Sequence, residues 1–265
     1  MDQATSAGVS RRAFVGVASA TLGLGALCLG GQAFAAGAGS APAPQSGPAA
    51  ATAANPPSDG FYANPSVTEL GKRAADPKRV LVVVDYQVDF VSGGVFGEIG
   101  PAKALEGAIY ERVKEYQDAG DIVIYTMDTH PADLFDYTRE GGVNPLHCDP
   151  ATEGWQVYGK VRELLTPEKA LLVKKGTYGS MDLPFVIENI RRQGVLIESI
   201  EMAGVSTTCR VLHNAIILYN AFPELPIVFD IATTASYSDE QTVEQLKELE
   251  TWGFAVDWRD YDLEH

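Results

Sequence analysis

Hydrophobic and polar positions along residues 79–257 alternate between short buried runs and longer amphipathic stretches. The apolar runs are short and rich in β-branched residues, as expected for buried strands, and cover residues 79–84, 122–126, 170–173, 195–202, 227–230 and 254–256. Helical spacing is found between them, in residues 102–119, 155–165, 183–192, 211–221 and 238–251. Strands that alternate with helices form parallel sheets covered on both faces, so the pattern predicts a three-layer α/β/α sandwich with a six-stranded parallel sheet.

Polar residues at the ends of three of these strands are candidates for chemistry, because ligands bind beyond the carboxyl ends of parallel strands. Asp85 follows the first strand and Lys175 follows the third. Residues 204–211 follow the fourth strand as a sharp turn that contains Cys209, and a helix start can support a cysteine nucleophile. The alternatives are that Asp85 caps the next loop and that Lys175 belongs to a solvated edge.

A second group of residues has the spacing of a metal site. Asp128 and His130 are two positions apart, so in an extended segment both side chains lie on the same face, and His147 returns from the following loop. One carboxylate and two histidines with open positions are typical of a catalytic divalent metal. The alternative is that the two histidines are ordinary loop residues.

The N-terminal residues have the pattern of an export signal. Arg11 and Arg12 precede a mildly apolar, glycine-rich run over residues 15–30, and Ala33-Phe34-Ala35 has the form of a cleavage site. The paired arginines favour a twin-arginine signal over a transmembrane anchor, since the run is short. We therefore expect a signal peptide at 1–35, a disordered Ala/Pro-rich linker at 36–60 and a folded domain at 61–265.

The composition narrows the choice of partners and location. The formal net charge of −15 disfavours nucleic acid and anionic membranes as partners and so favours a small-molecule partner, and 46% hydrophobic residues are typical of an ordinary globular protein. We expect a protein exported to the periplasm, cell envelope or medium, without stable membrane insertion once the signal is removed. Its remaining cysteines, Cys148 and Cys209, either form one disulfide or stay free beside functional residues.

Several segments together resemble one family of enzymes. They are residues 83–90, 128–130, 138–142, 145–148, 153–155 and 175–180, and in order and spacing they are similar to the nicotinamidase-like branch of the isochorismatase-like cysteine hydrolases. The resemblance implies that Asp85 is a general base and that Lys175 stabilises a thiolate. The cysteine would then attack an amide carbonyl, release ammonia and form a thioester that water hydrolyses.

The resemblance also implies the surroundings of the reaction. Asp128, His130 and His147 would bind a divalent zinc, iron or manganese ion. The oxyanion would lie at a turn with a cis peptide, formed by Val205, Ser206 and Arg210. Aromatic walls of the substrate pocket would come from Phe90, Phe135, Tyr137 and Trp155, which could equally be ordinary core residues. Because members of the family often form dimers or tetramers, a homo-oligomer is a further expectation.

The turn departs from the family at one position. The nucleophile of the family usually lies six residues after the turn glycine, and that position, counted from Gly204, is Arg210, so that Cys209 is one residue early. One residue on a helix is a rotation of about 100°. Three explanations remain open: the turn is one residue tighter, Arg210 enters the pocket of a catalytically silent binding protein, or the protein is a cysteine-independent hydrolase of the isochorismatase type.

The sequence therefore predicts an exported amidase that hydrolyses a small amide such as nicotinamide to the acid and ammonia. The retained aspartate, lysine and metal-type residues support chemistry or tight binding of a polar small molecule in all three alternatives.

Overall fold

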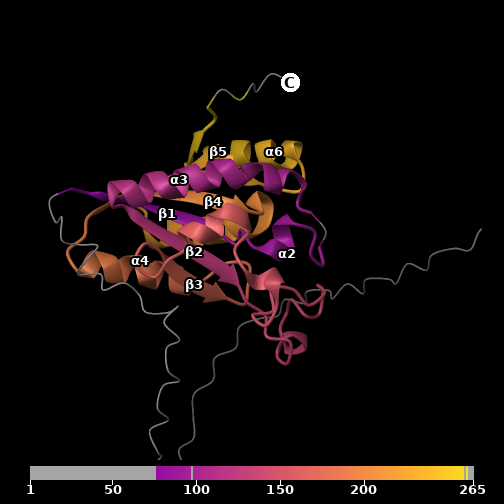
Figure 1. Cartoon of the computed structure of the whole chain (residues 1–265). Coiled ribbons are helices and arrows are strands. Elements are labelled where there is room, and N and C mark those ends of the chain that lie inside the picture. The colour runs from indigo at the N-terminus through magenta and orange to yellow at the C-terminus, as the bar shows by residue number, and fades with distance from the viewer. Residues whose placement is uncertain (1–75, 97, 260, 262–265) are drawn as a thin grey trace, which may run out of the picture. The chain divides into compact units, whose positions relative to one another are not determined.

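Six parallel strands form the centre of the protein in a computed structural model that describes residues 76–96, 98–259 and 261 (Figure 1). The strands are β1 (Lys78–Val84), β2 (Ile122–Asp128), β3 (Leu171–Lys175), β4 (Ile197–Val205), β5 (Ile227–Ala235) and β6 (Ala255–Asp257). Their order in the sheet is β3-β2-β1-β4-β5-β6. The expected signal peptide at 1–35 and linker at 36–60 lie outside the described residues, as does the beginning of the expected domain.

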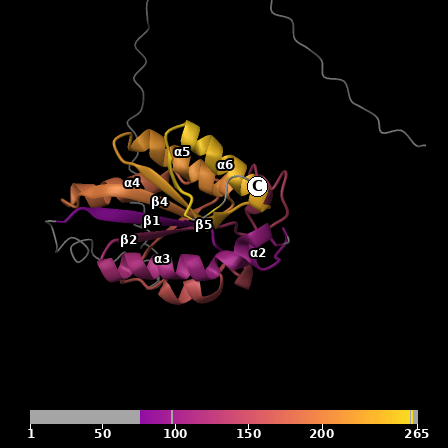
Figure 2. The same ribbon diagram turned by 90° about the horizontal axis from the view of Figure 1, so that it is seen from above.

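Helices cover both faces of this sheet, as Figure 2 shows. One face carries α4 (Asp182–Arg192), α5 (Leu212–Ala221) and α6 (Asp239–Thr251), and the other carries α3 (Glu106–Ala119). Strand β1 is buried on both sides because Val80, Val82 and Val84 pack into the first core and Leu81 and Val83 into the second. The predicted three-layer sandwich with a six-stranded parallel sheet is thus confirmed.

One predicted helix is wrong. Residues 155–165 form no α-helix but two short 3₁₀ turns, Glu153–Trp155 and Gly159–Leu164. Gly159 has a φ of +58°, which interrupts any right-handed helix, and Val157 forms an antiparallel bridge with Gln87. The apolar residues of this segment therefore pack beneath α3 without a continuous helix.

Four short helical segments complete the described chain. They are α2 (Val88–Val91) and 3₁₀ turns at Gly100–Leu105 and Phe135–Tyr137, together with a π-helical turn at Thr207–Val211. Among the described residues, no helix is both long and apolar enough to cross a membrane.

The strand order places two of the predicted site segments side by side. β1 lies between β2 and β4, and Val84 at its end is in register with Gly204 of β4. The chain moves outward in one direction through β2 and β3 and in the other through β4, β5 and β6. Such a switch point is where open α/β sheets form their binding crevices. Asp85 and the turn after β4 both lie at this point.

Candidate active site and metal cluster

Asp85 and Lys175 form a buried ion pair at the switch point of the sheet. Lys175 Nζ lies 2.5 Å from Asp85 Oδ2 and 3.3 Å from Asp128 Oδ1. Both side chains are almost fully buried, with exposures of 0% for Asp85 and 7% for Lys175 as residues. The structure therefore brings together the predicted base and the predicted cation.

The backbone and a neighbouring hydroxyl hold Asp85 in place. Its φ of +47° is uncommon for a residue with a side chain and turns the carboxylate away from the direction of β1. Thr126 Oγ1, on the adjacent strand, donates a hydrogen bond of 2.6 Å to Asp85 Oδ1. One carboxylate oxygen is thus held by Thr126 and the other by Lys175, which sets the orientation of the group.

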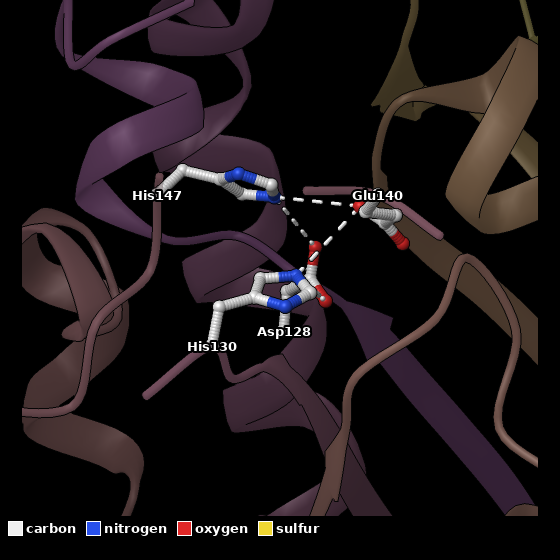
Figure 3. Close-up of side chains that lie close together, drawn as sticks. All are labelled: Asp128, His130, Glu140 and His147. Carbon is white, nitrogen blue, oxygen red and sulfur yellow. Dashed lines mark ion pairs between the residues drawn. The ribbon is translucent and has the colours of Figure 1, made fainter. Parts of the chain in front are cut away.

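Four buried side chains form a cluster with the composition of a metal site (Figure 3). One ligand atom each from Asp128, His130, Glu140 and His147 lie within 4.8 Å of one another. His130 Nε2 is 3.1 Å from Asp128 Oδ1, and His147 Nε2 is 3.4 Å from Asp128 Oδ2. The structure gathers the three predicted ligands and adds Glu140, whose carboxylate oxygen is 3.6 Å from His147 Nε2.

The unpaired atoms of this cluster fit a bound cation. Both ring nitrogens of His130, both carboxylate oxygens of Glu140 and Asp128 Oδ1 are buried and have no hydrogen-bond partner. Buried polar atoms normally have hydrogen-bond partners. Several buried atoms that lack such partners and face one another are therefore suited to binding a positive ion. Two carboxylates and two imidazoles are a donor set suited to zinc, iron or manganese.

Hydrogen bonds from neighbouring residues hold the candidate metal ligands in place. Gln87 accepts a 2.8 Å hydrogen bond from the backbone N–H of Asp128 and donates one of 3.0 Å to its carbonyl, so it fixes the end of β2. Asp89 accepts a 2.7 Å hydrogen bond from the backbone N–H of Cys148. His147 Nδ1 lies 2.9 Å from the carbonyl of Pro145, an arrangement that leaves Nε2 directed into the cluster.

Burial and charge shift the pKa values of these groups in opposite directions. Burial raises the pKa of Asp85 above its ordinary value, although Lys175 acts against this shift. Burial also acts against the charge of Asp128, but Lys175 and the nearby imidazoles of His130 and His147 outweigh it and hold the pKa of Asp128 well below its ordinary value. Burial lowers the pKa of Lys175 less than its two carboxylate neighbours raise it, so this lysine stays charged.

The turn after β4 has the predicted cis peptide, between Val205 and Ser206. It continues as a π-helical turn, in which Val211 N–H donates to the Ser206 carbonyl at 3.1 Å. A π turn contains one residue more than an α turn, so this turn is wider and not tighter. Thr207 and Thr208 anchor it to the end of β5 through Thr234 and to Ser236 beyond it, with oxygen–oxygen distances of 2.8 and 2.6 Å.

Arg210, rather than Cys209, reaches Asp85 from this turn. Its Nε lies 3.0 Å from Asp128 Oδ2 and 3.7 Å from Asp85 Oδ2, and only 4% of the residue is exposed. Its guanidinium also stacks on Phe90, with 4.1 Å from Cζ to the ring centroid. The structure thus places Arg210 beside Asp85 and Asp128, the position that the second of the three explanations gives it.

Cys209 lies beside this cluster without a hydrogen bond from its sulfur to Asp85 or Lys175 among the described residues. Its carbonyl is 2.7 Å from His213 Nδ1 on the exposed side of α5. The thiol is partly buried, and burial raises its pKa above the ordinary value, with the neighbouring Arg210 acting against that shift. Cys148 is also a free thiol, so the alternative of a disulfide between the two is not realised.

Three of the four predicted aromatic residues lie near the cluster. Phe90 is below Arg210, the ring of Phe135 is 5.0 Å from that of His130, and Trp155 donates from Nε1 to Thr129 at 2.9 Å. Tyr137 is 89% exposed and does not join them. The chain segment that follows it instead supplies Glu140.

Sequence reasoning missed Glu140, Phe96 and Tyr178. Phe96 lies 4.6 Å from the ring of His147, and Tyr178 lies 5.4 Å from the guanidinium of Arg210. Glu140 belongs to a segment that resembles the family, but an acidic loop residue has no periodicity that marks it as buried. Phe96 and Tyr178 flank segments already singled out, and only the folded chain shows which way their rings point.

The fold and site define a class of protein: a parallel α/β protein with a buried, metal-type cluster and an aspartate–lysine pair at the switch point of its sheet. The isochorismatase domain matches residues 79–256, which is most of the described chain. This chain belongs to the isochorismatase family.

Similar proteins come from several bacteria. An uncharacterized isochorismatase family protein, PncA, of Bacillus subtilis (strain 168) is 30% identical over 168 residues, or 62% of this chain and 89% of the relative. The crystal structure of the nicotinamidase/pyrazinamidase PncA from Bacillus subtilis superimposes with a TM-score of 0.61 at 28% identity, and covers 68% of this chain and 98% of its own. That of the pyrazinamidase/nicotinamidase from Streptococcus mutans UA159 has a TM-score of 0.61 at 26% identity, with 68% and 100% coverage.

Proposed function

We propose that this chain is a metal-containing hydrolase of a small amide, such as nicotinamide, which it converts to the acid and ammonia. The observation that carries the proposal is the buried Asp85–Lys175 pair at 2.5 Å, placed beside the four-residue metal-type cluster. Similarity to solved nicotinamidases over 68% of the chain supports an amide as the substrate.

In this proposal Asp85 accepts the proton of Cys209, and Lys175 stabilises the thiolate that results. The sulfur attacks the amide carbonyl, the C–N bond breaks, and ammonia leaves with the proton held by Asp85. Water then hydrolyses the thioester and frees the acid. Arg210 Nε is 3.7 Å from Asp85 Oδ2, so the attack by Cys209 requires Arg210 to move away from Asp85.

A divalent metal is the cofactor that we propose. Asp128, His130, Glu140 and His147 would hold it, because their unpaired buried atoms already face one another. When bound, the ion supplies a Lewis-acid centre that orients the substrate. Zinc, iron and manganese all accept this donor set.

Ammonia release from a panel of small amides tests the proposal. With zinc supplied, we expect turnover by the wild type and a loss of about a hundredfold to ten-thousandfold in Asp85→Asn, since that variant lacks the proton acceptor. Asp118→Asn changes an exposed aspartate of α3 in the same way and should keep full activity. Turnover that survives in Asp85→Asn contradicts the role of Asp85.

The same assay tests the thiol. We expect Cys209→Ala to abolish turnover, whereas Cys148→Ala, which removes a thiol without a proposed role, should retain turnover wherever the variant folds. Turnover that survives in Cys209→Ala removes the thioester step and favours a cysteine-independent hydrolysis of the isochorismatase type.

A second candidate function, binding without turnover, is favoured by the position of Arg210. Its guanidinium contacts Asp85 and Asp128 in the place where the family resemblance puts a nucleophile. Saturable binding of nicotinamide by calorimetry, without ammonia release under any metal, would support this candidate over the first.

We also propose that the protein is exported through its N-terminal twin-arginine pattern and assembles as a homo-oligomer. Export rests on residues 11–35, and assembly rests on the family resemblance. The partner of the active site would be the small-molecule amide itself.

A further inference from the structure

Arg210 is joined to a set of charged groups whose balance changes when a metal binds. Ion pairs of 4.0 Å or less link Asp85, Asp128, Glu140, Lys175 and Arg210. Three carboxylates and two cations leave this set with one excess negative charge. A divalent ion converts the excess into one positive charge, because the histidines bind metals in their neutral form.

The partner that Arg210 has in this structure is also a ligand of the proposed metal. Its Nε hydrogen-bonds to Asp128 Oδ2 at 3.0 Å, and its NH2 nitrogen lies 3.3 Å from His147 Nε2 and 3.8 Å from Glu140 Oε2. If these residues held a metal, Arg210 would lose them as acceptors, and its guanidinium would lie beside a like charge. Asp85 offers little in exchange, since Thr126 and Lys175 already hold both of its oxygens.

The aromatic rings keep the guanidinium of Arg210 in the site even when its acidic partners are taken. Phe90 lies against it at 4.1 Å, and Phe96 and Tyr178 lie at 5.9 and 5.4 Å from Cζ. Rings stabilise an arginine cation by stacking but do not satisfy its N–H groups. A buried guanidinium with free N–H groups at a positively charged site is complementary to a carboxylate, which it binds with two parallel hydrogen bonds.

We infer that Arg210 is a specificity-determining residue that binds a carboxylate group of the ligand once the metal is in place. The inference rests on the proposed function and adds to it a preference of the site for ligands that carry a carboxylate. It assigns Arg210 a role that neither the thiol nor the Asp85–Lys175 pair fulfils.

Calorimetric binding of nicotinate and nicotinamide to the zinc-loaded full chain tests this inference. The two ligands share one ring and differ in carrying a carboxylate or a neutral amide. We expect the wild type to bind nicotinate at least about tenfold more tightly, and Arg210→Gln to lose that preference, since a charged hydrogen bond is removed. Arg210→Lys keeps the charge without the planar fork and should retain part of the preference.

Arg192→Gln is the matched control, because it removes an exposed arginine of α4 and should leave the preference unchanged. Equal binding of the two ligands by the wild type overturns the inference. So does a preference that persists in Arg210→Gln, since the metal alone would then recognise the carboxylate. If Arg210→Gln folds poorly, Arg210→Lys provides the test instead. A preference for nicotinate that is unchanged in Arg210→Lys also counts against the role of the arginine.

The outcomes also separate this inference from the proposed function. Ammonia release from neutral amides without any preference for nicotinate would overturn the inference and leave the hydrolase intact. A preference for nicotinate that depends on Arg210, without ammonia release from any amide, would support the inference and contradict the hydrolase.

Discussion

Arg210 is the residue whose position decides most about this site. It pairs with Asp128 Oδ2 at 3.0 Å, and its guanidinium lies 4.1 Å from the centre of the Phe90 ring. A metal that used Asp128 Oδ2 as a ligand would have to displace this cation. The residue therefore acts as a competitor for the metal cluster as well as a candidate ligand-binding group.

We predict that Arg210→Met raises the affinity for Zn²⁺ by at least about tenfold, because it removes a positive charge that lies within a few ångströms of the metal ligands. Competition with a chromogenic chelator measures the affinity directly. Arg192→Met, at an exposed arginine of α4, should leave it unchanged. An affinity that is equal in wild type and Arg210→Met would show that the guanidinium does not compete.

At the scale of residues, the sequence predicted Asp85, Lys175 and three metal-type ligands, since each follows a recognisable strand or belongs to a familiar spacing. It did not predict Glu140, whose burial depends on a loop without periodicity. It left open which of Cys209 and Arg210 faces Asp85, because helical rotation makes neighbouring residues point in different directions. Only the width of the turn, set by tertiary contacts of Thr207 and Thr208, resolves that question.

At the scale of elements, the contact between β1 and β4 is closest at the strand ends. Gly204 has a φ of +103°, and a Cβ at this position would meet the backbone of Val84. A larger residue would have to push apart the two strands that carry Asp85 and the π turn.

We predict that Gly204→Ala lowers the free energy of unfolding by at least about 3 kcal/mol, through backbone strain and overpacking together. Gly107→Ala is the matched control, because a Cβ at this exposed position of α3 meets nothing within 4 Å. It should stabilise the helix by up to about 1 kcal/mol. Urea unfolding of both variants measures the two effects. An equal loss of unfolding free energy in both variants would contradict the special role of Gly204.

Asp230 joins β5 to two other parts of the chain. Arg112 of α3 lies 2.6 Å from its Oδ2, and Arg259, beyond β6, donates to both of its oxygens. Burial acts against the charge of Asp230, but the hydrogen bonds from Arg259 outweigh it and lower its pKa below the ordinary value. Stability from this carboxylate is therefore present above the unfolded pKa of about 3.9 and is lost as the pH falls through the lower folded value.

We predict that Asp230→Asn lowers the free energy of unfolding by about 1–3 kcal/mol at pH 7, and that its difference from the wild type shrinks below about pH 4. Urea titrations at pH 7, 5, 4 and 3.5 measure this difference. Asp118→Asn, at an exposed pair, should change stability much less at every pH. A gap that widens as the pH falls would show that the folded pKa is not lowered.

The elements themselves were largely predictable from hydrophobic periodicity, because every predicted strand is a short apolar run and four of the five predicted helices correspond to α3, α4, α5 and α6. The exception, residues 155–165, has helical spacing but also Gly159, whose positive φ breaks it into 3₁₀ turns. Strand ends were less predictable, since β5 continues to Ala235 through Thr234, which pairs with Gly204 of β4 and contacts Thr207 of the π turn.

At the scale of the whole molecule, the three-layer architecture follows from the alternation of strands and helices, and similarity to solved structures agrees with it. The order β3-β2-β1-β4-β5-β6 was not predicted. It depends on which side of β1 each crossover takes, and the apolar pattern of the strands is the same for either choice.

The paired arginines near the N-terminus predict export of the whole chain. We expect that the double variant Arg11→Lys/Arg12→Lys stays inside a bacterial host that has a twin-arginine translocase, because lysines do not replace the paired arginines of such signals. Cell fractionation measures the distribution. Arg73→Lys, outside the signal, is the control and should be exported normally, and export of the double variant would contradict the twin-arginine route.

The threonine anchors of the π turn have a consequence for protein engineering. Thr207 and Thr208 hold the turn to Thr234 and Ser236 by contacts that do not involve the side chain of residue 210. Installing a thiol next to Asp85 and Lys175 therefore requires no insertion or deletion. The single substitution Arg210→Cys would place a thiol at the position where the family resemblance puts the nucleophile, beside Asp85 and Lys175.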